Sequence, residues 1–152
     1  MMENNIIIIN EQNLFIPNQE QIIEWIEESL IYTQNKANIT LKTFAKYDMQ
    51  NLNNKFRKMN KPTNILAFPY ESINQVLQGD LAICPEIIIK EAKQQSKTIN
   101  SHFAHIIIHG LLHIAGYTHE DDKNARIMEA TEAAILSIFN IADPYIKEKK
   151  CL

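Results

Sequence analysis

The spacing of hydrophobic residues along the chain predicts both strands and helices, without internal repeats. Short apolar or alternating runs predict four strands, over residues 6–10, 39–45, 65–68 and 80–84. Pro69 and Pro85 directly follow the last two runs. Since proline cannot donate a hydrogen bond to a neighbouring strand, we expect both strands to stop there. The sequence NKPTN over residues 60–64 predicts a turn.

Apolar residues three or four positions apart predict five helices. They are expected over residues 19–33, from a cap at Asp48 onwards, and over residues 86–97, 101–115 and 122–140. The first carries an apolar stripe formed by Ile22, Ile23, Trp25, Ile26 and Leu30. The last directs Ile127, Met128, Ala134, Ile135, Leu136 and Phe139 towards the core. The polar residues 143–152 are expected to fray.

Length and composition favour one soluble domain spanning residues 1–152. The chain has 152 residues, of which 45% are hydrophobic, enough to fill a single core. Its longest apolar runs are too short to span a membrane. The N-terminal sequence MMENNIIIIN lacks the basic start and cleavage site of a secretory signal. Cys84 and Cys151 lie far apart in sequence, which favours a reducing compartment, and we expect a cytoplasmic protein.

Charge is unevenly distributed along a chain whose net charge is −3. Residues 1–35 contain six glutamates and no lysine or arginine. Residues 36–61 contain seven basic residues, with Asp48 as the single acidic one. A local basic surface suits a polyanion bound at one face, because phosphate contacts depend on the nearby potential. Ordinary solvated lysines on a helix and a strand fit this pattern equally well.

The most informative chemistry lies in residues 103–122, FAHIIIHGLLHIAGYTHEDD, which contain the pattern HxxxHxxGxxH. His109 and His113 are four residues apart, so on a helix their rings project from one face and can share a metal ion. Gly116 can end that helix in a left-handed conformation, which would bring His119 round as a third ligand. Three protein ligands leave one tetrahedral position open, as catalytic zinc sites do.

One position separates this pattern from the HExxHxxGxxH of zinc peptidases. Those enzymes use the glutamate beside the first histidine as general base, and Gly110 stands there in this chain. The residues therefore support metal binding better than peptide hydrolysis. The alternative is that the three histidines are core or surface residues that have this spacing by chance. His105 is expected to support the ligands or to belong to the core, and His102 to lie at the surface.

Four blocks in order resemble the YbeY family of bacterial endoribonucleases. Residues 52–69 read LNNKFRKMNKPTNILAFP, residues 78–86 read QGDLAICPE, and residues 104–119 read AHIIIHGLLHIAGYTH, with IMEATEAAIL and DPYI nearer the end. The resemblance implies a single α+β domain in which a mixed four-stranded sheet packs with about five helices. It places a metal site at the end of a central helix. It also implies work on ribosomal RNA, in maturation of the small-subunit 3′ end and in ribosome quality control.

The resemblance further implies that His109, His113 and His119 bind one divalent transition metal per chain, with Zn²⁺ the expected ion. It assigns importance for activity to Arg57. The chain departs from the usual family pattern at Lys58, Asn60, Asn64, Ala67 and Thr118. The last of these replaces an aspartate that could accept a proton beside the third ligand. We therefore expect slower chemistry, or the use of Glu120 or Asp121 instead.

The residues and the resemblance agree on phosphodiester hydrolysis. A metal held by neutral imidazoles lowers the pKa of its water towards neutrality, which supplies hydroxide without a protein base. We take Arg57 and His109 as catalytic, with the guanidinium stabilising charge on the phosphate. Three lysines would hold the RNA backbone together with that arginine, namely Lys55, Lys58 and Lys61.

Single-stranded RNA, ribosomal RNA and the small ribosomal subunit are the expected partners, without DNA or membrane. Single strands are favoured because their phosphates can enter a cleft. Two other classes of protein fit parts of the pattern. A zinc-dependent peptidase or amide hydrolase would share the ligands, and a ribosome-assembly factor could use the metal for stability alone. Arg57 could also be an exposed helix residue in a weak ion pair.

Overall fold

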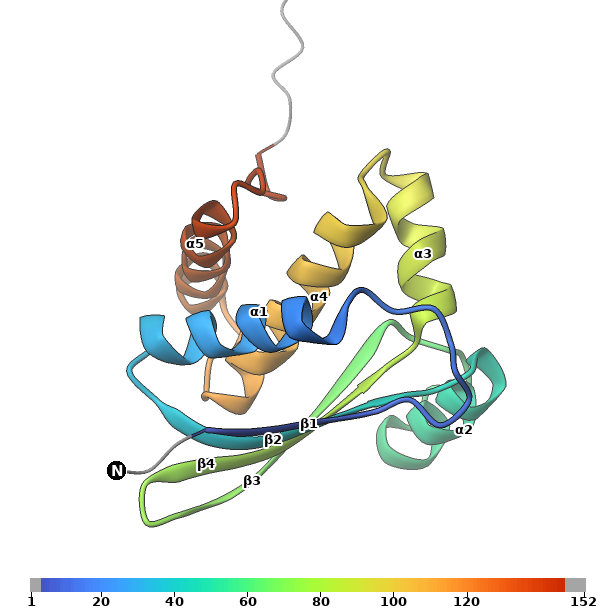
Figure 1. Cartoon of the computed structure of the whole chain (residues 1–152), viewed down its shortest axis with the longest axis horizontal. Helices are drawn as coiled ribbons and strands as arrows, with labels where there is room; N and C mark the ends of the chain where they lie inside the picture. The colour runs from blue at the N-terminus through green and yellow to red at the C-terminus, as the bar shows by residue number, and fades with distance from the viewer. Residues whose placement is uncertain (1–3, 147–152) are drawn as a thin grey trace, which may run out of the picture.

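A computed structural model describes residues 4–146. They form a mixed four-stranded sheet and five helices in one α+β domain, as the resemblance implies (Figure 1). The strands are β1 (Asn5–Ile9), β2 (Lys36–Thr43), β3 (Ile65–Ile73) and β4 (Val76–Ile83). The helices are α1 (Gln19–Tyr32), α2 (Lys46–Arg57), α3 (Pro85–Gln94), α4 (Ile99–Ile114) and α5 (Asp122–Ile138). Within residues 4–146, none of these helices combines the length and the hydrophobicity that crossing a membrane requires.

The sheet has the strand order β1-β2-β4-β3. Strands β1, β2 and β4 run parallel, and β3 pairs antiparallel with β4 at one edge. Helices α1, α3, α4 and α5 lie on one side of the sheet, and α2 stands apart at its end (Figure 1). The fold therefore has one thickly covered sheet face and one face that only α2 covers in part.

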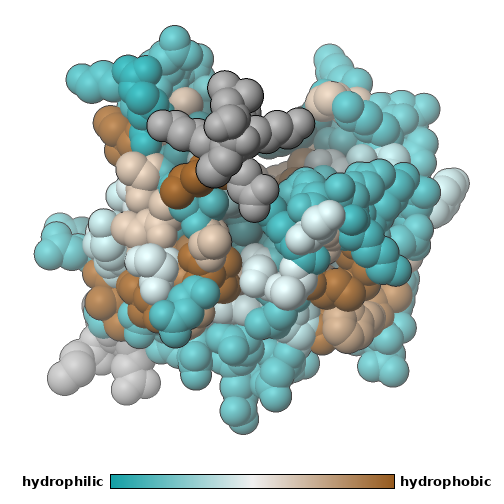
Figure 2. Space-filling view, turned by 90° about the horizontal axis from the view of Figure 1, so that it is seen from above, coloured by the Kyte–Doolittle hydropathy of each residue, from teal (hydrophilic) through white to brown (hydrophobic). Residues whose placement is uncertain are grey.

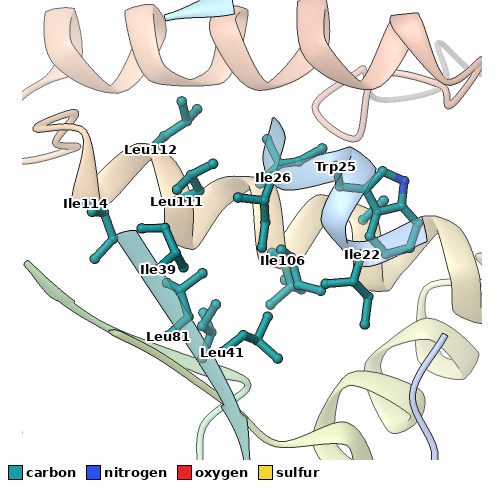
Figure 3. Close-up of a cluster of buried hydrophobic side chains, with 14 of the residues drawn as sticks. Ile22, Trp25, Ile26, Ile39, Leu41, Leu81, Ile106, Leu111, Leu112 and Ile114 are labelled. Carbon is teal, nitrogen blue, oxygen red and sulfur yellow. The ribbon is translucent and has the colours of Figure 1, made fainter. Parts of the chain in front are cut away.

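The main core lies between the sheet and α4, the central helix. Strand β2 alternates strictly: Ala37, Ile39 and Leu41 are buried towards the helices, and the intervening residues face the other side. Figure 3 shows how side chains from three elements meet there, namely Ile22, Trp25 and Ile26 of α1, Ile39, Leu41 and Leu81 of the sheet, and Ile106, Leu111, Leu112 and Ile114 of α4. Helix α4 is thereby held firmly against the sheet.

Seen from the helical side, hydrophilic residues cover much of the surface and hydrophobic ones form separate patches (Figure 2).

Two glycines allow α4 to approach the sheet closely. A Cβ atom at Gly79 of β4 would lie 2.6 Å from Ile114 Cδ1, and one at Gly110 of α4 would meet the side chains of Ile65 and Leu81. Real Cβ atoms do not approach this closely, so larger residues at either position would push the helix away. The position of α4, and of any side chain it carries, therefore depends on these glycines.

Several predicted boundaries differ from the structure: β2 begins at Lys36 rather than at residue 39, β4 begins at Val76 rather than at residue 80, and α3 ends at Gln94 rather than at residue 97. Two others are wrong for identifiable reasons. Strand β3 does not stop at Pro69 but continues to Ile73. It is an edge strand, and proline is tolerated there because outward N–H groups need no partner strand. Helix α2 begins at Lys46 rather than after a cap at Asp48. The Asp48 carboxylate lies in the first turn, where its charge complements the helix dipole, and accepts a hydrogen bond from Gln12 Nε2 at 3.3 Å.

Part of the tail that was expected to fray packs onto α5. Within residues 143–146, Tyr145 Oη donates a hydrogen bond to Glu132 Oε2 at 2.8 Å. Residues 147–152, the remainder of that expectation, lie outside the described residues.

Candidate metal centre

Three histidines converge at the C-terminal half of α4. His109 and His113 lie one turn apart on the helix, and His119 comes from the loop that leads to α5. Gly116 adopts φ +98° just beyond the helix end, as the pattern predicts, and the chain turns back there. One ring nitrogen of each histidine lies within 4.8 Å of the others. The three predicted ligands thus form a group that can hold a metal ion.

The second ring nitrogen of both helix histidines is already bonded. His109 Nδ1 lies 2.8 Å from Glu132 Oε1, and His113 Nδ1 lies 3.0 Å from the carbonyl oxygen of Tyr117. Both partners are acceptors, so each Nδ1 carries the proton and each Nε2 presents a lone pair. These two Nε2 atoms are only 3.1 Å apart. A shared proton or a metal ion bound to both nitrogens accounts for so short a separation, and with His119 as a third nitrogen donor the set fits a divalent ion.

Glu132 of α5 is fully buried, and its carboxylate accepts the hydrogen bond that orients His109. Burial alone would raise the pKa of its carboxyl, but hydrogen bonds from His105, His109 and Tyr145 lower that pKa to about 2. Burial, together with the neighbouring His109, also lowers the pKa of His113. A charged carboxylate bonded to one ligand, beside a His113 whose lowered pKa favours the neutral form, suits a metal site.

The two remaining histidines of α4 also pair with carboxylates, one buried and one partly exposed. His105 Nε2 lies 3.3 Å from Glu132 Oε1 and 3.1 Å from Tyr145 Oη, so it supports a ligand through Glu132, as expected. His102, expected at the surface, is instead only 2% exposed, and its Nε2 lies 3.0 Å from Glu91 Oε1. That prediction is wrong because the partner carboxylate comes from α3, which the local sequence does not reveal.

A cleft of about 370 Å³ opens over the three histidines. Asn64 and residues of β3, including Ala67, form one wall, and Arg57 from the end of α2 also lines it. The structure therefore brings the predicted arginine and the predicted ligands to one cavity. The three lysines expected to hold RNA are not among the described residues that line it, namely Lys55, Lys58 and Lys61.

The two acidic residues proposed in place of the family's aspartate have different environments. Asp121 caps α5, and its carboxylate accepts hydrogen bonds from Asn124 N at 2.8 Å and Asn124 Nδ2 at 2.9 Å. Glu120 lines the cleft beside Thr118 and His119. Of the two, Glu120 is the carboxylate that faces the cavity.

Sequence reasoning missed two residues of this centre, Glu132 and Tyr145. A signal existed for the first: Glu132 lies four residues after Met128 and three before Ile135, on the apolar stripe of α5. A charged residue on a buried stripe needs a partner, which could have pointed to the histidines. Tyr145 follows the last helix in an irregular segment, where no periodicity indicates which way a side chain points.

Comparison with known proteins agrees with this geometry. The family model described as Endoribonuclease YbeY matches residues 7–140. A protein of Buchnera aphidicola subsp. Baizongia pistaciae named Endoribonuclease YbeY is 40% identical over 146 residues, which cover 93% of this chain and 95% of that protein. A solution structure of a Thermotoga maritima protein shares the fold with a TM-score of 0.61 at 22% identity, covering 93% of this chain and 99% of that one. This chain belongs to the YbeY endoribonuclease family.

Proposed function

We propose that this protein is a metal-dependent endoribonuclease that cleaves single-stranded RNA. Membership of an endoribonuclease family supports the reaction class. The observation that carries the metal dependence is the pair of Nε2 atoms 3.1 Å apart, each with its Nδ1 bonded elsewhere, in a cleft that Arg57 also lines. We extend the proposal to ribosomal RNA of the small subunit in the cytoplasm, in 3′ end maturation and ribosome quality control.

The residues of the cleft have distinct roles in the proposed reaction. Zn²⁺ bound by His109, His113 and His119 would supply a nucleophile by lowering the pKa of a water molecule towards neutrality. Glu132 keeps the proton on His109 Nδ1, and the Tyr117 carbonyl does the same for His113.

Two cleft side chains then act on the substrate. Arg57 can hold two phosphate oxygens with its planar fork and stabilise the charge that develops on them. The Glu120 carboxylate is placed to accept a proton at the cleft wall, in the role that Thr118 cannot fill.

The structure disfavours the alternative of a zinc peptidase or amide hydrolase. Such an enzyme would carry its general base at position 110, beside the first ligand. There the side chains of Ile65 and Leu81 occupy the space that even a Cβ atom would need. A binding factor with a purely structural metal would not need an arginine in the cleft, so the position of Arg57 favours an enzyme over a binding factor.

The test is to incubate the purified protein with an RNA that contains paired and unpaired segments, with and without a chelator. We expect cleavage in unpaired segments, loss of cleavage with the chelator, and rates that differ among divalent ions while circular dichroism shows an unchanged fold. A DNA of the same sequence is the control. Cleavage that persists in the chelator would refute the metal dependence, and an intact RNA would refute the function. Identifying the product ends distinguishes attack by water from attack by the ribose 2′-hydroxyl.

A further inference from the structure

A second groove lies on the sheet face opposite the metal cleft. Its volume is about 320 Å³, and aromatic rings from three parts of the chain line it: Phe44 after β2, Phe56 of α2, and Phe68 and Tyr70 of β3. Phe56 is 56% exposed and Tyr70 is 55% exposed, although large aromatic side chains usually gain from burial. The groove is therefore an unusual concentration of uncovered aromatic surface.

The sheet register explains why these rings are uncovered. Leu66, Phe68 and Tyr70 alternate with residues that face the helices, so all three point to the face on which α2 lies. Helix α2 packs over the beginning of β3 only, through Met49 and Leu52, which join Leu66 in a small separate core. The strand continues beyond the helix: Phe68 still meets Phe56 edge-on, with 5.2 Å between ring centres, whereas Tyr70 further along is exposed.

Positive charge borders the groove. Lys42 Nζ lies 5.5 Å from the ring centre of Phe44, and Lys55 Nζ lies 5.5 Å from that of Phe56. Negative charge is present as well: Asp80 lines the groove and accepts a hydrogen bond from Tyr70 Oη at 2.8 Å, and Glu11 lies 3.7 Å from Lys42 Nζ. Of the basic residues over 36–61, Lys42 lines this groove and Lys55 lies beside one of its rings, whereas Arg57 lines the metal cleft.

The groove and the metal cleft lie on opposite sides of the same two elements. On α2, Phe56 lines the groove, and the next residue, Arg57, lines the cleft. On the edge strand β3, Ala67 lines the cleft, and the next residue, Phe68, lines the groove. Consecutive Cα atoms are about 3.8 Å apart, so the two cavities lie close together, on either side of both elements. A chain molecule bound at the metal could pass around the edge of β3 into the groove.

We propose that this aromatic groove binds nucleotides of the single-stranded RNA substrate that flank the scissile phosphate. Bases stack on Phe56 and Tyr70, and Lys42 and Lys55 contact the phosphates between them, which is how proteins hold single strands without reading their sequence. The inference rests on the proposed endoribonuclease function. Lysines beside exposed rings favour RNA over an apolar protein partner, because an apolar partner offers no negative charge for the lysines to contact.

The test compares two oligouridines, one of about 4 nucleotides, which fits the metal cleft alone, and one of about 16, which can reach the groove. Single-turnover cleavage over a range of protein concentrations gives an apparent Kd for each RNA. We expect Tyr70→Ala and Phe56→Leu each to weaken binding of the long RNA about tenfold relative to the short one. Tyr70→Phe keeps the ring and should retain the wild-type ratio, and Tyr32→Ala, on α1, is the control for loss of an exposed tyrosine.

The outcomes separate this inference from the function on which it rests. If the wild type cleaves both RNAs and every variant keeps the wild-type ratio of affinities, the groove does not bind RNA and is left for a protein partner. If the wild type neither binds nor cleaves RNA, the proposed function fails and the inference fails with it. Ultraviolet crosslinking of the long RNA to the wild type gives an independent readout, with crosslinks expected in the β3 peptide that contains Phe68 and Tyr70.

Discussion

Arg57 lies at the end of α2 with its side chain at the metal cleft, where binding and chemistry can be separated. If its guanidinium stabilises charge in the transition state, its loss should fall mainly on kcat. We expect Arg57→Lys to keep most of the RNA affinity but to cleave about 10²-fold more slowly, because an ammonium lacks the planar fork. Single-turnover cleavage at saturating protein measures this, with Arg126→Lys as the matched control. Wild-type rates in Arg57→Lys and Arg57→Ala would reduce the residue to a surface charge.

His113 supplies a second prediction at this scale. We expect the isolated protein to contain about one transition metal ion per chain and His113→Ala to contain almost none, because two imidazoles hold a zinc ion far less firmly than three. Elemental analysis after dialysis measures the content. Thr118→Ala is a suitable control, since it changes the same cleft without removing a ring nitrogen. Equal metal content in wild type and His113→Ala would contradict the ligand assignment.

Glu132 would act on a bound metal only through His109. In Glu132→Gln the size of the side chain is kept, but the carboxylate that holds the proton on His109 Nδ1 is lost. We expect metal affinity to fall by about 10–100-fold, as it does for partners of metal-binding histidines in general. Competition with a chelating dye measures the affinity, and circular dichroism shows whether the fold is kept. An unchanged affinity in a folded variant would show that Glu132 has only a structural role.

At the scale of elements, the contact between α4 and the sheet controls where the ligands stand. Gly79→Ala would place a Cβ within about 3 Å of three side-chain atoms of Ile114. We expect a loss of about 1–3 kcal/mol in the free energy of unfolding, measured by urea denaturation. Adding Ile114→Ala removes those atoms, so the double variant should be less destabilised than the sum of the two single variants. Simple additivity would mean that the contact is already relaxed.

Helices were predicted well because their apolar spacing is local. Strand ends were not, because Pro69 is compatible with a strand only at a sheet edge, and edge position is a property of the whole topology. The same division applies to the site. The spacing within residues 109–119 brings three histidines together without knowledge of the fold. Glu132, Tyr145 and the partner of His102 depend on how α3, α5 and the segment after α5 pack around α4.

At the scale of the molecule, charge is divided between two regions of sequence, and the basic one borders both cavities. We expect replacement of Lys55, Lys58 and Lys61 by Glu to weaken RNA binding and to flatten its dependence on salt. Each lost phosphate contact lowers the slope by about 0.7 for a single strand. Binding measured over a series of salt concentrations tests this, with Lys90, Lys93 and Lys97 replaced by Glu as the control. An unchanged slope would place the RNA on another surface.

Helix α4 carries two of the three histidines on one face and fills the main core with the other. An ion that binds the folded chain but not the unfolded one therefore acts on the whole folding equilibrium through this helix. The gain is about 2.7 kcal/mol when the free ion is at a hundred times its Kd, a large part of the stability of an ordinary domain. A cell short of the ion would accordingly lose more than catalysis. Newly made chains would spend longer unfolded and exposed to proteases, so the supply of the metal would set how much of the protein exists at all.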